Sequence, residues 1–119
     1  MKLMLPFVVS DQLLSDILIT AVEGGSDYWA YYSEVKRDAE LNILSVRVTE
    51  QADHDVNQEV VTKVVTPHDL AAAIESLASR VATAGFPYRH IQSVINEDVD
   101  AETADVILQL AVLGEVIYG

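Results

Sequence analysis

Apolar residues recur at the spacing of one helical face in two stretches of the chain. The first follows Ser10, a residue type that favours the N-cap position. It ends at Gly24-Gly25, because glycine can adopt the left-handed conformation that terminates a helix. The second begins at Thr66–Asp69, where an N-cap threonine, a proline in the first turn and a following acid indicate a capping box, and it ends near Gly85.

A third helical stretch has almost no polar face. It follows Asp98 or Asp100, either of which can cap it, and it stays apolar on nearly every side up to Tyr118. Such a helix lies inside a core or between subunits, so the pattern favours a homo-oligomer. The preceding residues 86–96 fit either a short strand or a helical turn.

Runs of β-branched and aromatic residues predict strands. We expect one strand at residues 2–9 and three more at residues 28–36, 41–50 and 59–65. Polar links join the last three, which favours an antiparallel meander. Valines occupy both faces of the last strand, at positions 60, 61, 64 and 65, and this predicts a central place in the sheet or a subunit contact.

These elements predict a single domain over residues 1–119, since no linker or repeat divides the chain. The expected fold class is α+β, with a mainly antiparallel sheet of about four strands and helices packed on one face. The expected order is β-α-β-β-β-α-α.

Composition changes this picture mainly through charge. Nineteen acidic residues face seven lysines and arginines, which gives a formal net charge of -12. That charge disfavours direct binding to nucleic acid or to an anionic membrane. The apolar run at residues 1–9 is short and interrupted by Pro6, and no run is long enough to span a bilayer, so we expect a soluble cytoplasmic protein.

The sequence contains no pattern typical of an active site. It has no cysteine, which excludes thiolate metal sites and thiol catalysis. The three histidines lack a metal-ligand spacing, and no Gly-x-Ser-x-Gly element occurs. We therefore predict a protein that is not an enzyme and that uses no metal and no cofactor.

Aromatic and basic residues are the candidates for ligand contacts. Alternation along a strand puts Trp29 and Tyr31 on one face, as a platform for a base or a partner, unless one aromatic pair fills the core. Arg89 and His90 follow further aromatic residues in an irregular segment. The guanidinium of Arg89 is well shaped to bind a phosphate or a carboxylate of a ligand. The alternative is that Arg89 forms an ion pair at the protein surface. With Arg47, these residues form the predicted ligand-binding set.

Three segments carry a resemblance: Val22–Trp29, Val65–Leu70 and Asp100–Gly119. In these the chain resembles small acidic proteins of unknown function that are encoded by bacteriophages and prophages. The resemblance implies no activity. It implies a setting, namely a phage accessory protein acting in the cytoplasm of a bacterial host cell.

Three functional hypotheses follow. The first is a non-catalytic binder that sequesters a nucleotide-like small molecule, for example a signal of host immunity. The alternative is an acidic protein-protein inhibitor that imitates DNA and blocks a nucleic-acid-binding host protein. The third is a structural or assembly protein of the virion.

Overall fold

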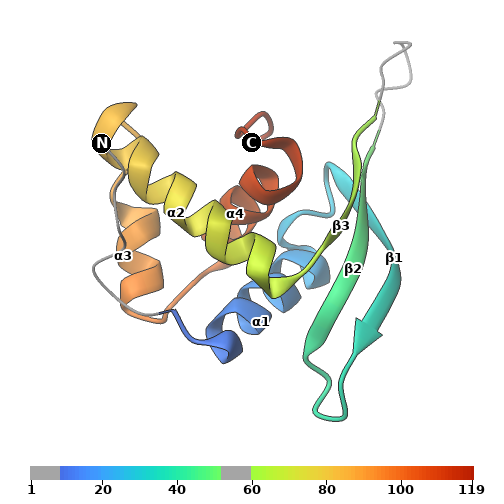
Figure 1. The fold of residues 1–119 in the computed structure, drawn as a ribbon. Coiled ribbons are helices and arrows are strands. Elements are labelled where there is room, and N and C mark those ends of the chain that lie inside the picture. Colours follow the sequence, from blue (N-terminus) through green and yellow to red (C-terminus); the bar gives the residue numbers. More distant parts are fainter. Residues whose placement is uncertain (1–8, 52–59) are drawn as a thin grey trace.

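The computed structural model describes residues 9–51 and 60–119, which form a helical layer beside a small sheet (Figure 1). The α+β class is confirmed, with three strands in the part described. The strand expected at residues 2–9 falls outside that part except for Val9, which is not in a strand. The elements are, in chain order, α1 (Asp11–Thr20), the π-helical turn η1 (Ala21–Gly25), β1 (Ala30–Arg37), β2 (Ile43–Glu50), β3 (Thr62–Val65), α2 (Pro67–Thr83), α3 (Arg89–Ile95) and α4 (Ala101–Leu113).

The sheet is antiparallel, and its described strands run in the order β1-β2-β3, so among them β2 is central and β3 lies at an edge. Among the described strands, a central position for the last strand is therefore wrong, and its alternative, a subunit contact, stays a prediction. Val65 is buried, whereas Val64 points away from the helices and is 47% exposed. A β-branched side chain fits either face of a pleated strand, so valines alone do not show that both faces are covered.

One face of the sheet packs on the helices, and no element of the described chain covers the other (Figure 1). The register aligns two rows of residues across the uncovered side, and we call these six residues the outer sheet face. The rows are Tyr31, Thr49 and Thr62, and Ser33, Arg47 and Val64.

Side-chain caps set the helix boundaries largely as the sequence indicates. Ser10 Oγ accepts a hydrogen bond from the Leu13 N–H, 3.1 Å away, and α1 continues through η1 to Gly25. Gly25 is required there, because a Cβ would lie 2.9 Å from the Ala101 carbonyl oxygen of α4. Asp100 caps α4 by accepting from the Thr103 N–H at 2.8 Å. Residues 86–96 resolve into α3, the helical alternative.

The capping box of α2 gives a local test of this account. Thr66 Oγ1 accepts from the Asp69 N–H, and Asp69 Oδ2 accepts from the Thr66 N–H at 2.8 Å. We expect Thr66→Ala to lower the free energy of unfolding by about 1 kcal/mol in urea titration. Thr83→Ala, at the exposed end of the same helix, should change it by less than about 0.5 kcal/mol. Equal losses would contradict the capping role.

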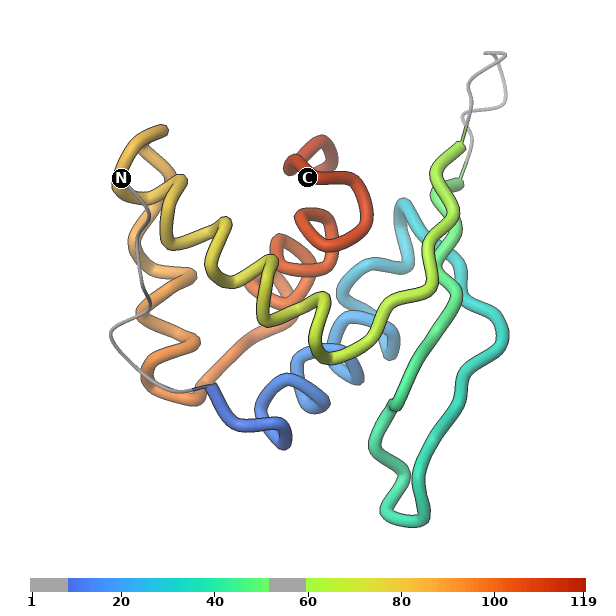
Figure 2. Tube along the Cα trace, in the orientation of Figure 1, coloured from blue at the N-terminus to red at the C-terminus, as the bar shows by residue number. Residues whose placement is uncertain are grey.

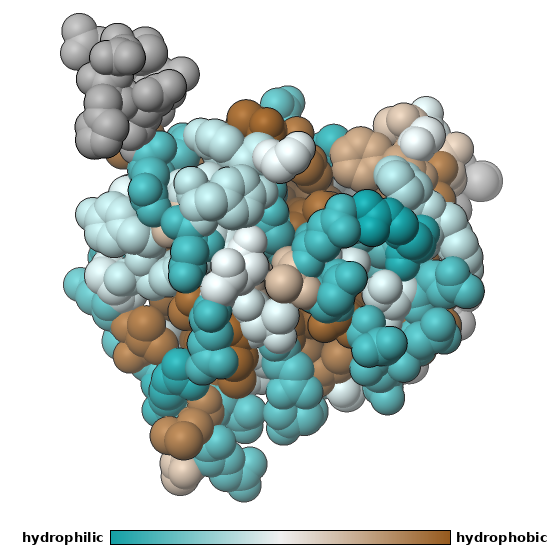
Figure 3. Space-filling model, turned by 180° about the vertical axis from the view of Figure 1, so that it is seen from behind, coloured by the Kyte–Doolittle hydropathy of each residue, from teal (hydrophilic) through white to brown (hydrophobic). Residues whose placement is uncertain are grey.

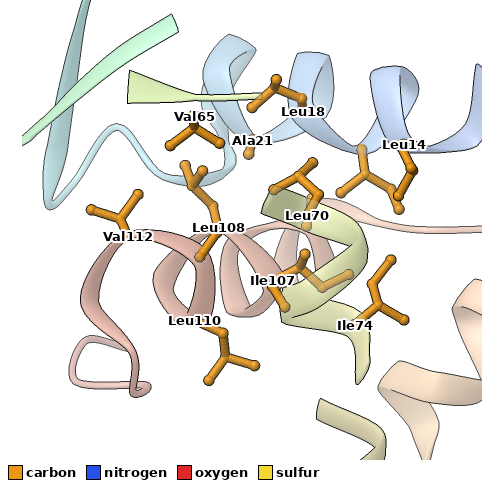
Figure 4. Close-up of a cluster of buried hydrophobic side chains, with 14 of the residues drawn as sticks. Leu14, Leu18, Ala21, Val65, Leu70, Ile74, Ile107, Leu108, Leu110 and Val112 are labelled. Carbon is orange, nitrogen blue, oxygen red and sulfur yellow. The ribbon is translucent and has the colours of Figure 1, made fainter. Parts of the chain in front are cut away.

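Helix α4 is covered from within the chain. Its buried side chains Ile107 and Leu108 pack against Leu70 and Ile74 of α2 and against α1 and η1 (Figure 4). The apolar character of α4 therefore does not require a second subunit, and the reason for expecting an oligomer from this helix no longer holds. No helix of the described residues has the length and apolar character needed to cross a membrane.

Candidate functional site

A buried carboxylate, Asp105 of α4, accepts hydrogen bonds from four side chains. Its Oδ1 accepts from Ser26 Oγ at 2.8 Å and from Trp29 Nε1 at 2.6 Å. Its Oδ2 accepts from Gln109 Nε2 at 3.1 Å and from the Tyr28 hydroxyl. All four donors are neutral, so hydrogen bonds rather than a counter-ion stabilise this carboxylate away from water.

The turn before β1 brings three of these donors together. Ser26 accepts backbone hydrogen bonds from the N–H groups of Trp29 and Ala30, at 3.2 and 3.0 Å, so residues 26–29 form a tight turn between η1 and β1. Tyr28 lines the cavity beside Asp105, and burial, with the hydrogen bond to Asp105, raises the pKa of its phenol. The phenol therefore stays protonated and acts as a donor.

Trp29 and Tyr31 do not share a face, contrary to the alternation expected from the sequence. Trp29 precedes β1, is 1% exposed and belongs to the turn. Tyr31 is the second residue of β1, lies on the outer sheet face and is 56% exposed. The period-two rule fails because the strand begins one residue after Trp29, so the two aromatic residues do not form a single platform.

The C-terminal segment folds back onto the same network. After Gly114 the chain turns toward α4 (Figure 2). Gln109, which is fully buried, accepts from the N–H groups of Ile117 and Tyr118 at 2.9 Å and donates to the Tyr118 carbonyl at 3.1 Å. The Tyr118 ring stacks on Trp29, with ring centroids 5.7 Å apart, and its hydroxyl donates to Glu50. The side-chain amide of Gln109 thus connects α4 to the backbone of the C-terminal segment.

A cavity of about 510 Å³ lies between η1, the N-terminal half of α4 and the C-terminal segment. Its walls combine bare backbone at three glycines, an alanine, two carboxylates, two phenols and two valines. Among the described residues, no lysine or arginine lines it. The lining residues that matter for the chemistry are Gly25, Tyr28, Ala101, Glu102, Asp105 and Tyr118.

Arg89, a predicted ligand contact, forms an ion pair beside this cavity. Its Nη1 and Nη2 lie 2.9 and 2.5 Å from the two carboxylate oxygens of Glu102. This bidentate contact raises the pKa of Arg89 and lowers the pKa of Glu102. Both side chains are more than half exposed, so the pair adds little stability. The guanidinium fork is occupied by a carboxylate of the chain itself.

His90, also a predicted ligand contact, is a buried residue of the helical layer. It is 4% exposed, and its Nδ1 lies 2.7 Å from Thr103 Oγ1, which links α3 to α4. Burial, followed by the positive charge of Arg89, lowers the pKa of His90 below its ordinary value. The neutral imidazole is therefore the form that the fold favours.

This lowered pKa predicts a pH dependence of stability. The unfolded state, in which the imidazole has its ordinary pKa of about 6.5, binds the proton first, so stability falls as pH drops below that value. We expect the free energy of unfolding of His90→Gln, measured by urea titration, to depend less on pH than that of the wild type between about pH 7 and pH 5. The two slopes should differ by up to about 1.4 kcal/mol per pH unit, the limit for one proton. His68→Gln, at an exposed position of α2, should keep the wild-type slope. The same slope in both variants would contradict this account.

The structure separates the predicted ligand-binding set into three places. Trp29 belongs to the Asp105 network, while Arg89 and His90 lie at the start of α3, next to α4. Tyr31 and Arg47 lie on the outer sheet face, where Arg47 Nε is 2.6 Å from a carboxylate oxygen of Glu34. These residues therefore do not form one pocket.

Sequence reasoning missed the two residues that organise the site, Asp105 and Gln109. They are polar, four residues apart and surrounded by apolar residues in α4. That spacing puts both on one face of a helix, and a buried polar side chain needs partners. Two polar residues on one face of an otherwise apolar helix were the feature of the sequence from which this polar cluster could have been predicted.

Comparison with known proteins finds no match, whether among protein-family models, curated proteins or solved structures.

Proposed function

We propose that the protein is a non-catalytic binder and that the cavity beside Asp105 takes one compact organic ligand. The cavity carries this proposal, because its volume of about 510 Å³ is in the range of small-molecule sites. It also combines valine surface with a few convergent polar groups, as such sites do. The resemblance to phage proteins suggests the setting, a bacterial cytoplasm.

Charge narrows the class of ligand. The cavity wall includes the carboxylates of Glu102 and Asp105 and, in the described part of the chain, no basic side chain. The Glu102 carboxylate is paired with Arg89, but the partners of Asp105 are all neutral, so an anion would meet repulsion from Asp105, whereas a neutral molecule or an amine would not. The two arginines that could hold a phosphate, Arg47 and Arg89, already contact Glu34 and Glu102. This geometry favours a neutral or cationic ligand over the nucleotide-like molecule expected from the sequence, and a ligand screen distinguishes the two.

A thermal-melting screen tests this proposal. The panel contains compact amines, neutral heterocycles, and cyclic and linear nucleotides. A ligand at about 100 times its dissociation constant stabilises the folded state by about 2.7 kcal/mol, which raises the melting temperature by several degrees. We expect amines or neutral heterocycles to produce this rise and nucleotides not to.

Two tryptophan variants show whether the ligand occupies the cavity. Ala101 is exposed at the start of α4 and lines the cavity, so Ala101→Trp should fill it and abolish the shift. Ala82 is exposed near the end of α2, and Ala82→Trp should respond as the wild type does. A shift that persists in Ala101→Trp, or one produced only by nucleotides, would contradict the proposal.

A second candidate is the acidic protein-protein inhibitor, and the distribution of charge favours it. Residues 9–29 and 66–119, which form the helical layer and its connections, hold twelve acidic and two basic residues. A basic partner would be attracted to that layer. If this function holds, the protein should compete with DNA for a basic DNA-binding protein at low salt, and the competition should weaken as salt screens the charges. Equal competition at low and high salt would count against it.

A further inference from the structure

The sheet and the helical layer differ in net charge. The strands and their described connections, residues 30–51 and 60–65, contain four acidic and four basic residues, so this part is neutral. The helical layer has a net charge of -10. On the outer sheet face, Arg47 is neutralised by Glu34. Two copies of the chain can therefore approach through their sheets with little electrostatic repulsion, but not through their helical layers.

Exposed apolar side chains also gather on the sheet part. Eleven large hydrophobic side chains are exposed in the described chain, and seven of them lie within residues 30–65, so the sheet and not the helical layer carries most of this surface. Two of the seven, Tyr31 and Val64, belong to the outer sheet face. On the sheet side of Figure 3, at the left, brown surface is interspersed with white and teal. Gathered apolar surface of this kind is typical of an interaction site.

The two edges of the sheet are poorly suited to pairing with another strand. Glu34 has a φ of 51°, and the register of β1 shifts between Ser33 and Lys36, so this edge is bulged. Among the described strands the other edge is β3, which is four residues long. Bulges and short strands prevent edge-to-edge association. The sheet can therefore contact another molecule through its face and not through its edges.

From these observations we infer that a second copy of this chain packs its outer sheet face against the same face of the first. The contact is isologous, which means that the same residues of both copies form it. The row that contains Tyr31 and the row that contains Val64 contact the same rows of the second copy, and the two sheets stack as in a β-sandwich. The acidic helical layers then face outward on both sides. A basic partner would instead be drawn to the helical layer, and an acidic one finds no net positive charge on the sheet.

Sedimentation velocity over a concentration series from about 1 µM to about 1 mM tests this inference. We expect a reversible monomer-dimer equilibrium that tightens with added salt, because salt screens the residual repulsion between two acidic chains. Val64→Glu should raise the dissociation constant of the dimer by about 100-fold, since it puts two like charges in the contact. Tyr31→Glu should do the same.

A matched variant shows whether the sheet is the contact. Ile95 is an exposed apolar residue of α3, in the helical layer, and Ile95→Glu should leave the dissociation constant within about 2-fold of the wild type. Thermal melting of each variant shows that it is folded. A monomer at every concentration would overturn the inference. So would a dimer that dissociates with Ile95→Glu and persists with both sheet variants.

Discussion

Replacing Asp105 by alanine is expected to lower the free energy of unfolding by about 3 to 5 kcal/mol, a large part of the stability of a small domain. The substitution removes the acceptor of four donors, of which Gln109 keeps the Tyr118 carbonyl and Tyr28 is half exposed to water, so the loss falls mainly on the buried donors of Ser26 and Trp29. Each buried donor that loses its partner costs roughly 1 to 3 kcal/mol, and water entering from the adjacent cavity offsets part of the sum. Urea-induced unfolding measures the loss directly.

Glu75→Ala is the matched control for Asp105→Ala. Glu75 is an acidic residue on an exposed side of α2, so its removal changes the net charge equally and breaks no buried network. We expect a change of less than about 0.5 kcal/mol. If both variants lose the same amount, or if Asp105→Ala loses less than about 1 kcal/mol, the buried network does not hold the fold together as described.

Replacing Trp29 by alanine is expected to cost about 3 to 5 kcal/mol as well. The indole is almost fully buried, stacks on Tyr118 and donates to Asp105. Its loss opens a large void and removes the surface on which the C-terminal segment rests. The same denaturant titration measures this effect, and hydrogen exchange at Ile117 and Tyr118 should become faster, because their N–H groups depend on that segment staying docked.

Tyr31→Ala is the control for Trp29→Ala, because both residues are aromatic and they lie two positions apart in the sequence. Tyr31 is 56% exposed on the outer sheet face, so its truncation should cost less than about 1 kcal/mol. It should also leave hydrogen exchange at the C-terminal segment unchanged. Similar losses in the two variants would mean that Trp29 and Tyr31 have equivalent environments, in contradiction to the structure.

Local signals in the sequence predicted where three helices begin, whereas the end of α4 was missed: the helix stops at Leu113, before Gly114, and the apolar run continues to Tyr118. Ser10, Thr66 and Asp100 each cap a helix through contacts within three residues, so a reader of the sequence can recognise them without knowing the fold. The three described strands were found for a similar reason, since β-branched residues favour a pleated surface wherever the strand lies in the sheet.

Long-range contacts explain what the sequence did not reveal. Asp105 meets its donors Ser26 and Trp29 across more than seventy residues. The ion pair of Arg89 with Glu102 forms only because α3 and α4 meet, and it occupies a guanidinium that the sequence offers to a ligand. Strand order likewise depends on tertiary pairing, which is why β3, expected at the centre of the sheet or at a subunit contact, lies at an edge of the described strands.

Native mass spectrometry of the protein purified from a bacterial host tests most directly the central claim, that the cavity beside Asp105 binds a compact ligand without negative charge. We predict a retained neutral or cationic molecule in the wild type and in Ala82→Trp, and none in Ala101→Trp. A nucleotide retained equally by all three proteins would contradict the claim. So would a wild-type protein that remains empty and binds no member of the ligand panel.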